Sequence, residues 1–251
     1  MFGIRGINSE TWQLNNNFRM KRAILPLLLL LCFCAKSQQT FFLTDPEFAF
    51  KQAQEFYQKQ YYSLAYPLFR ELEQDQAVRP QLYESFNFEN IHFYTLVCSL
   101  NQDDSTAADP AKIFIERENN AARGQMMAYH LAEFYFRRKN YEAALKLYEN
   151  SSIDNLSNDE IATLKFHKGY TYFIKKNFDL AKPLFDAIRQ LRSDIHYIDA
   201  NYYYGYICFY QKKYNDAYSA FSIIENDPKY AKIIPYYIAN IGKQGCIVGL
   251  P

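Results

Sequence analysis

The 251-residue chain carries 28 Lys and Arg against 27 Asp and Glu, a formal net charge of +1, so it lacks the basic excess typical of nucleic-acid-binding proteins. Eight glycines and nine prolines argue against a disordered or collagen-like chain, and so few glycines leave little room for tight turns or a phosphate-binding loop. Aromatic residues make up 18% of the chain, with 23 Tyr and 21 Phe, which favours an all-helical protein whose helices pack through aromatic side chains.

The N-terminal segment has the pattern of a secretory signal peptide. Lys21 and Arg22 precede an apolar run over residues 23–35 that is followed by small residues. This run of about 13 residues is shorter than the roughly 20 that a membrane-spanning helix needs. We therefore expect a signal peptide over residues 20–37, preceded by an upstream extension over residues 1–19 that results from a misassigned start.

This pattern predicts an exported protein in the periplasm, or associated with the outer membrane, of a Gram-negative-type cell. A lipid anchor or an uncleaved anchor is one alternative, although Cys32 and Cys34 both follow large residues rather than the small one that lipid attachment needs. A cytosolic protein is the other. Membrane contact is expected only through the N-terminal segment. Cleavage after Ser37 removes five basic residues and one acidic residue, which changes the net charge from +1 to −3 and weakens a nucleic-acid function further.

Three cysteines remain after cleavage: Cys98, Cys208 and Cys246. An odd number with no close pair predicts neither a disulfide framework nor a zinc site. Since Cys98 and Cys208 lie in apolar helical runs, we expect both to be buried as small hydrophobic side chains.

A pattern of small and aromatic residues returns along the rest of the chain. Each copy has a small residue, usually an aromatic three residues later, a polar turn, an aromatic that opens a second helix, an alanine three residues on, and an aromatic four residues after that. The copies are Ala53, Phe56, Tyr62, Ala65 and Phe69; Ala132, Tyr135, Tyr141, Ala144 and Tyr148; Gly169, Tyr172, Phe178, Ala181 and Phe185; and Gly205, Cys208, Tyr214, Ala217 and Phe221. On two antiparallel helices, the small residues allow close approach and the aromatics fill the seam.

This pattern resembles the tetratricopeptide repeat (TPR), a helix–turn–helix unit of about 34 residues. The resemblance covers residues 45–241 and implies an all-α, TPR-type right-handed solenoid of antiparallel helix pairs. The chain departs from the family at Cys208, where an aromatic is usual, and in slightly longer connections between units.

Helix start and stop signals agree with this register. Asp45 before Pro46 predicts a helix start. Ser157 with Glu160 predicts a capping box ahead of a helix that continues to Lys175. Asp227 with the following proline predicts the end of another helix.

The second unit is degenerate, with an expected first helix over residues 88–100, a polar loop over residues 101–109 and a short second helix over residues 111–116. In all, we expect about five helix pairs and one extra helix over residues 235–243. Residues 242–251 are expected to form an irregular tail. Because no partner helix follows, the chain is interpreted as truncated relative to a longer repeat array.

No pattern of catalytic or metal-binding residues stands out. His92, His130, His167 and His196 fall in different units, and no two have the spacing of a metal pair on one helix. The chain has no Gly-x-Gly pattern, P-loop or nucleophile elbow. We therefore expect a protein that is not an enzyme and has no cofactor, no metal and no catalytic residue.

In TPR proteins, the first helix of each pair lines a concave groove. The resemblance places three sets of residues in that groove: Met126, Tyr129, Glu133 and Phe136; Thr163, Phe166, Tyr170 and Phe173; and Asp199, Tyr202, Tyr206 and Phe209. Family members that bind a C-terminal carboxylate use Lys and Asn at two of these positions, so that mode is not expected here. The aromatic strip could bind a peptide, with Tyr supplying apolar area and a hydrogen-bonding tip, or its rings could simply pack against neighbouring repeats. Basic turns such as residues 137–139 are expected to cap helix C-termini.

The predicted function is a non-catalytic scaffold of the cell envelope that binds a protein or peptide partner of unknown identity in the TPR groove. Two alternatives remain: the sensor or adaptor part of a larger membrane-anchored regulator, and an accessory subunit of an outer-membrane or cell-wall assembly complex. Neither nucleic acid nor a small-molecule cofactor is expected as a partner.

Overall fold

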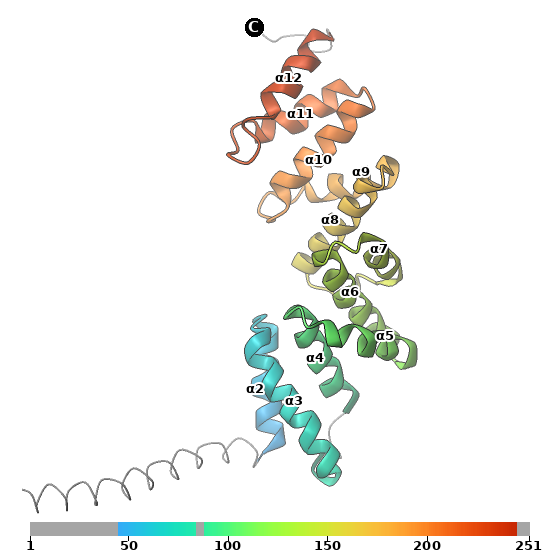
Figure 1. Cartoon of the computed structure of the whole chain (residues 1–251). Coiled ribbons are helices and arrows are strands. Elements are labelled where there is room, and N and C mark those ends of the chain that lie inside the picture. The colour runs from blue at the N-terminus through green and yellow to red at the C-terminus, as the bar shows by residue number, and fades with distance from the viewer. Residues whose placement is uncertain (1–44, 84–87, 245–251) are drawn as a thin grey trace, which may run out of the picture.

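The protein is represented by a computed structural model that describes residues 45–83 and 88–244. Within these residues it contains eleven α-helices and no β-strand (Figure 1). The predicted signal peptide, the segment before it and Cys246 lie outside the described residues. In the described part of the chain, no helix is both long and apolar enough to cross a membrane. The all-α prediction is therefore confirmed for this part.

Five helix pairs and one further helix form an elongated stack, with α2 at one end and α12 at the other (Figure 1). Two short 3-10 helices, η1 (Pro80–Tyr83) and η2 (Ser105–Ala107), lie in connections. The pairs are α2 (Pro46–Gln58) with α3 (Tyr62–Val78), α4 (Phe88–Asn101) with α5 (Ala108–Arg117), α6 (Ala121–Arg137) with α7 (Tyr141–Asn150), α8 (Asn158–Ile174) with α9 (Phe178–Ile188), and α10 (Tyr197–Tyr210) with α11 (Tyr214–Ile224), and α12 spans Ile234–Lys243. The helix-pair packing is that of a helical repeat.

The small residues of the sequence repeat lie where the two helices of a pair are closest. A Cβ atom added to Gly205 would lie 2.7 Å from Cε1 of Phe221, and one added to Gly169 would lie 3.2 Å from Cε1 of Phe185. Both phenylalanine rings are fully buried. The aligned alanines of the second helices are fully buried as well: Ala65, Ala144, Ala181 and Ala217. The small–aromatic pattern thus encodes the seam within each pair.

The turn inside each pair has the same backbone geometry in all five units. Its central residue has a left-handed φ of 58° or 59°, although none of the five is glycine: Gln60, Asp103, Lys139, Lys176 and Lys212. The following N–H bonds the carbonyl five residues earlier, as in Asn140 to Tyr135 at 2.9 Å and Lys213 to Cys208 at 2.8 Å. This is the Schellman ending, which satisfies the last carbonyls of the first helix.

The degenerate second unit keeps this turn, which aligns it with the others. Counted from its left-handed residue, Leu96 takes the small position of the first helix, and Ala108 takes the alanine position of the second. Lys112, on the exposed side of α5, replaces the seam aromatic. The second unit thus has the large Leu96 on its first helix and no seam ring on its second helix.

The prediction of a loop over residues 101–109 is wrong, because much of this segment is helical. Asp104 accepts hydrogen bonds from the backbone and side chain of Thr106 and so starts η2. The second helix α5 then begins at Ala108, three residues earlier than predicted. This local side-chain cap is the reason that polar residues here form turns of helix rather than a loop.

The predicted helix starts are confirmed. Asp45 caps α2 through hydrogen bonds from Glu47 N and Phe48 N, and Ser157 and Glu160 form a reciprocal capping box at α8. Helix α11 ends at Ile224, three residues before Asp227. The last helix, α12, continues through residues 242 and 243 into the segment expected to be irregular, while residues 245–251 lie outside the described part.

The basic turn after α6 contacts the preceding unit. Arg137 pairs with Asp103, with Nε 2.9 Å from Oδ1, and its Nη2 donates to the carbonyl oxygen of Leu100 at 2.6 Å. Arg138 Nη2 donates to the carbonyl oxygen of Asp103 at 2.7 Å. These arginines therefore satisfy carbonyl groups at the end of α4 and join two units.

Candidate functional site

A ladder of aromatic rings runs along the first helices from α6 to α12. Neighbouring ring centroids are 4.9–6.1 Å apart, mostly edge-to-face, the geometry that aromatic pairs prefer. We call this set the ring ladder: Phe136, Tyr170, Tyr203, Phe173, Tyr206 and Tyr237.

The structure divides the twelve predicted groove residues into two groups. Tyr129, Glu133 and Phe166 are buried, with 4%, 8% and 7% of their surface exposed. The other nine are half-buried: Met126, Phe136, Thr163, Tyr170, Phe173, Asp199, Tyr202, Tyr206 and Phe209. Packing therefore uses part of every ring, while the six rings of the second group keep a part open to solvent.

Two rings of the ladder were not among the predicted groove residues. Tyr203 contacts Tyr170, Phe173 and the buried Phe185, and so joins α8 and α9 to α10. Tyr237 of α12 stacks on Phe221 at 5.0 Å. The sequence signal for Tyr203 is the run of three tyrosines at positions 202–204. Three consecutive helical residues cannot all face one groove, so at least one of these rings must contact a neighbouring helix.

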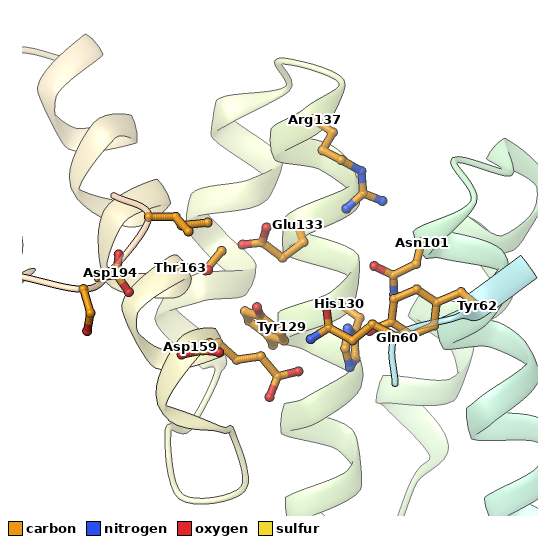
Figure 2. Close-up of a pocket in the computed structure, with 13 residues that line it drawn as sticks. Gln60, Tyr62, Asn101, Tyr129, His130, Glu133, Arg137, Asp159, Thr163 and Asp194 are labelled. Carbon is orange, nitrogen blue, oxygen red and sulfur yellow. The ribbon is translucent and has the colours of Figure 1, made fainter. Parts of the chain in front are cut away.

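A polar pocket of about 380 Å³ lies beside the ladder, between α6, the N-terminal end of α8 and the connection before α10 (Figure 2). The turn between α2 and α3 and the end of α4 close its other side. The lining residues are Gln60, Tyr62, Asn101, Tyr129, His130, Glu133, Arg137, Asp159, Glu160, Thr163, Ser193, Asp194 and Ile195. Three of them, Tyr129, Glu133 and Thr163, are residues that the resemblance places in the groove.

Glu133 is the best-connected carboxylate of the pocket. It accepts a hydrogen bond from Tyr148 Oη at 2.5 Å, and its Oε2 lies 2.9 Å from His167 Nδ1. The His167 ring stacks on Phe136 with a centroid separation of 3.8 Å. Through this contact the polar network of the pocket joins the first ring of the ladder.

His196 and His130 lie at the two sides of this network. The His196 ring stacks on Phe166 at 4.3 Å, and burial lowers its pKa, with the charge of His167 acting in the same direction. Burial lowers the pKa of His130 to about 4, so its ring is neutral at pH 7. Its Nε2 lies 3.5 Å from Tyr57 Oη. The neutral His130 ring therefore adds no positive charge to the lining of the pocket.

The pocket is acidic. Four carboxylates line it, those of Glu133, Asp159, Glu160 and Asp194, against a single Arg137, whose charge is already paired with Asp103 outside the lining. Burial raises the pKa of Tyr129, and the negative charges of Glu133 and Glu160 raise it further, so this phenol remains protonated.

Other groups in the described part do not form a metal or thiol site. No cluster of three or more His, Cys, Asp or Glu residues there has an arrangement that could hold a metal ion. Cys98 and Cys208 are buried free thiols, as predicted, and burial raises the pKa of Cys98 to about 12. Such a thiol is protonated and unreactive at neutral pH.

No protein-family model matches the chain, and no curated protein has a significantly similar sequence.

Proposed function

We propose that the chain is a TPR-type solenoid that acts as a non-catalytic scaffold, binding a protein or peptide partner along its first helices. The single observation that carries this proposal is the ring ladder, whose half-buried members form a continuous apolar strip with hydroxyl groups along it. Tyrosine-rich surfaces of this kind are favoured in protein recognition because each ring offers a large contact area at low entropic cost.

The TPR assignment is supported by the repeat itself. Four copies share the small and aromatic seam positions, and all five units share the left-handed turn, including the unit whose seam residues differ. A stack in which each unit contacts mainly its neighbours is the architecture of repeat proteins that present an extended binding surface. The proposed location in the cell envelope rests on the basic and apolar pattern of residues 20–37.

Replacement of Tyr170 and Tyr206 by Ala tests this function. Both rings are half-buried members of the ladder, whereas Tyr210, which is 66% exposed and lies outside the ladder, is the matched control. The tagged wild type, the double variant and Tyr210→Ala are crosslinked in the native envelope, and the partners are identified by mass spectrometry beside a thermal melt.

We expect a partner captured by the wild type and by Tyr210→Ala to be lost from the double variant while the melting temperature stays near that of the wild type. Equal capture of the partner by all three proteins would refute the proposal that the ring ladder binds it. Loss of partners together with a collapse of the melting temperature would instead assign both rings to the core, and the binding proposal would then lack its support.

A further inference from the structure

We propose that the acidic pocket binds a basic side chain, arginine or lysine, of the peptide partner. This inference rests on the proposed function, because it identifies the chemistry of the partner at one place on the same face. It differs from recognition of a C-terminal carboxylate, since the charge of the pocket has the opposite sign.

The charge balance of the lining favours a cation. The carboxylate of Asp159 makes no ion pair or hydrogen bond to any described residue, and the carboxylate of Asp194 accepts only the backbone N–H of His196, at 2.7 Å. The sole lining cation, Arg137, is held by Asp103. A positively charged side chain that enters the pocket would therefore meet carboxylates whose charge is not neutralised within the chain.

The hydroxyl of Tyr129 independently points to a ligand. The Tyr129 side chain is only 4% exposed and lines the pocket (Figure 2). Its Oη has no hydrogen-bond partner within the described part of the chain and is not among the buried polar atoms there that lack one, so it opens into the pocket. The polar tip of an otherwise buried tyrosine usually has a partner, so this oxygen is free to accept a hydrogen bond from a donor that enters the pocket. A guanidinium or ammonium group has such donors and no acceptor.

The shape of the pocket suits a long side chain with a charged end. Its volume of about 380 Å³ is in the range of small-ligand sites. The Tyr62 ring and Ile195, which is 84% exposed, add apolar surface to the lining, and the methylene stem of lysine or arginine can pack against such groups. Because His167 connects Glu133 to Phe136, a peptide lying on the ring ladder passes directly beside the pocket.

The test uses three capped pentapeptides with the sequence Leu-Ala-X-Ala-Leu, in which X is arginine, its neutral isostere citrulline, or glutamate. Binding to the full chain is followed by NMR titration at low salt, with agmatine as a free guanidinium that lacks a peptide. We expect the arginine peptide to bind about tenfold more tightly than the citrulline peptide and than agmatine, and the glutamate peptide to bind least.

Two variants assign the effect to the pocket. Tyr129→Phe removes only the unpaired hydroxyl. It should weaken binding of the arginine peptide about threefold to tenfold without lowering the melting temperature. The double variant Asp159→Asn, Asp194→Asn should bind the arginine peptide about tenfold more weakly than the wild type does. Glu225→Gln, an exposed carboxylate outside the pocket, is the control for net charge and should change nothing.

The possible failures are distinguishable. Equal binding of the arginine and citrulline peptides, or tighter binding of the glutamate peptide, would overturn the cation pocket while the binding function stands. Agmatine binding as tightly as the arginine peptide would assign the pocket to a free small cation and overturn the peptide assignment. If Tyr129→Phe bound the arginine peptide as tightly as the wild type, the hydroxyl argument would be wrong. Failure of the proposed function appears separately, as no change in crosslinked partners on loss of the ladder rings.

Discussion

Replacement of Gly205 by Ala tests the physical basis of the repeat. The new Cβ would lie 2.7 Å from Cε1, 2.9 Å from Cδ1 and 3.1 Å from Cζ of Phe221. Carbon atoms in contact normally lie about 3.5–4.0 Å apart, so the ring must retreat by nearly 1 Å. It cannot do so freely, because Phe221 is fully buried and stacks on Tyr237.

The expected magnitude is a balance of two terms. Overpacking of a close-packed core costs about 1–3 kcal/mol, and alanine in a helix gains up to about 1 kcal/mol over glycine. We therefore expect Gly205→Ala to lower the free energy of unfolding by about 1–2 kcal/mol. Gly169→Ala, with its nearest contact at 3.2 Å, should lie within about 1 kcal/mol of the wild type, since smaller shifts suffice there.

Urea unfolding followed by circular dichroism measures the series, with Gly124→Ala as the control. A Cβ at Gly124 would meet nothing closer than 4.0 Å, so only the helix-propensity gain of up to about 1 kcal/mol remains. The order of stability should be Gly124→Ala, Gly169→Ala and then Gly205→Ala. If Gly205→Ala were as stable as Gly124→Ala, the glycine would not be required for close approach and the account of the seam would be wrong.

Two further predictions concern the turns and the core. Lys176 has a left-handed φ of 59°, so Lys176→Gly should raise the free energy of unfolding by about 0.5–1 kcal/mol, whereas the neighbouring Lys175→Gly, at a φ of −74°, should lower it. A stability gain at both lysines, or at neither, in the same urea assay would contradict the turn geometry. His130 has a folded-state pKa of about 4, below its unfolded value of 6.5, so the unfolded chain binds the extra proton. Stability should therefore fall as the pH drops below 6.5, by about 2 kcal/mol between pH 7 and pH 5. His130→Gln should remove this part of the pH dependence in thermal melts at the two pH values, and an unchanged dependence would disprove it.

Much of the helix arrangement was predictable because the repeat reports local and nearest-neighbour contacts. A residue such as Ala144 or Phe185 is small or aromatic for a reason that lies within its own helix pair, and four aligned copies make the register clear. The capping box at Ser157 is similarly local. The second unit was harder to predict, because Leu96 stands where the other units have a small residue and the exposed Lys112 stands where they have a seam aromatic, so the pattern of residue types is lost there.

The candidate site was predictable only in part. The sequence places Tyr129, Glu133 and Thr163 on the first helices, but it does not reveal that they meet the turn after α2 and the connection before α10 in one acidic pocket. Nor does it distinguish the buried Phe166 from the half-buried Tyr170, since the two lie four residues apart on the same helix.

The amino-acid sequence by itself determined an all-α chain of five helix pairs and an extra helix, because small and aromatic residues at fixed spacing can bury their surfaces only as paired helices. Tertiary structure alone decided which rings remain open, that five non-glycine residues take a left-handed turn, and that four carboxylates share one pocket. The open rings and the pocket depend on contacts between units, which the pattern of residue types does not record. The left-handed turns recur at the same position in every unit, but they fall on Gln, Asp and Lys and not on glycine, the residue type that usually marks this geometry.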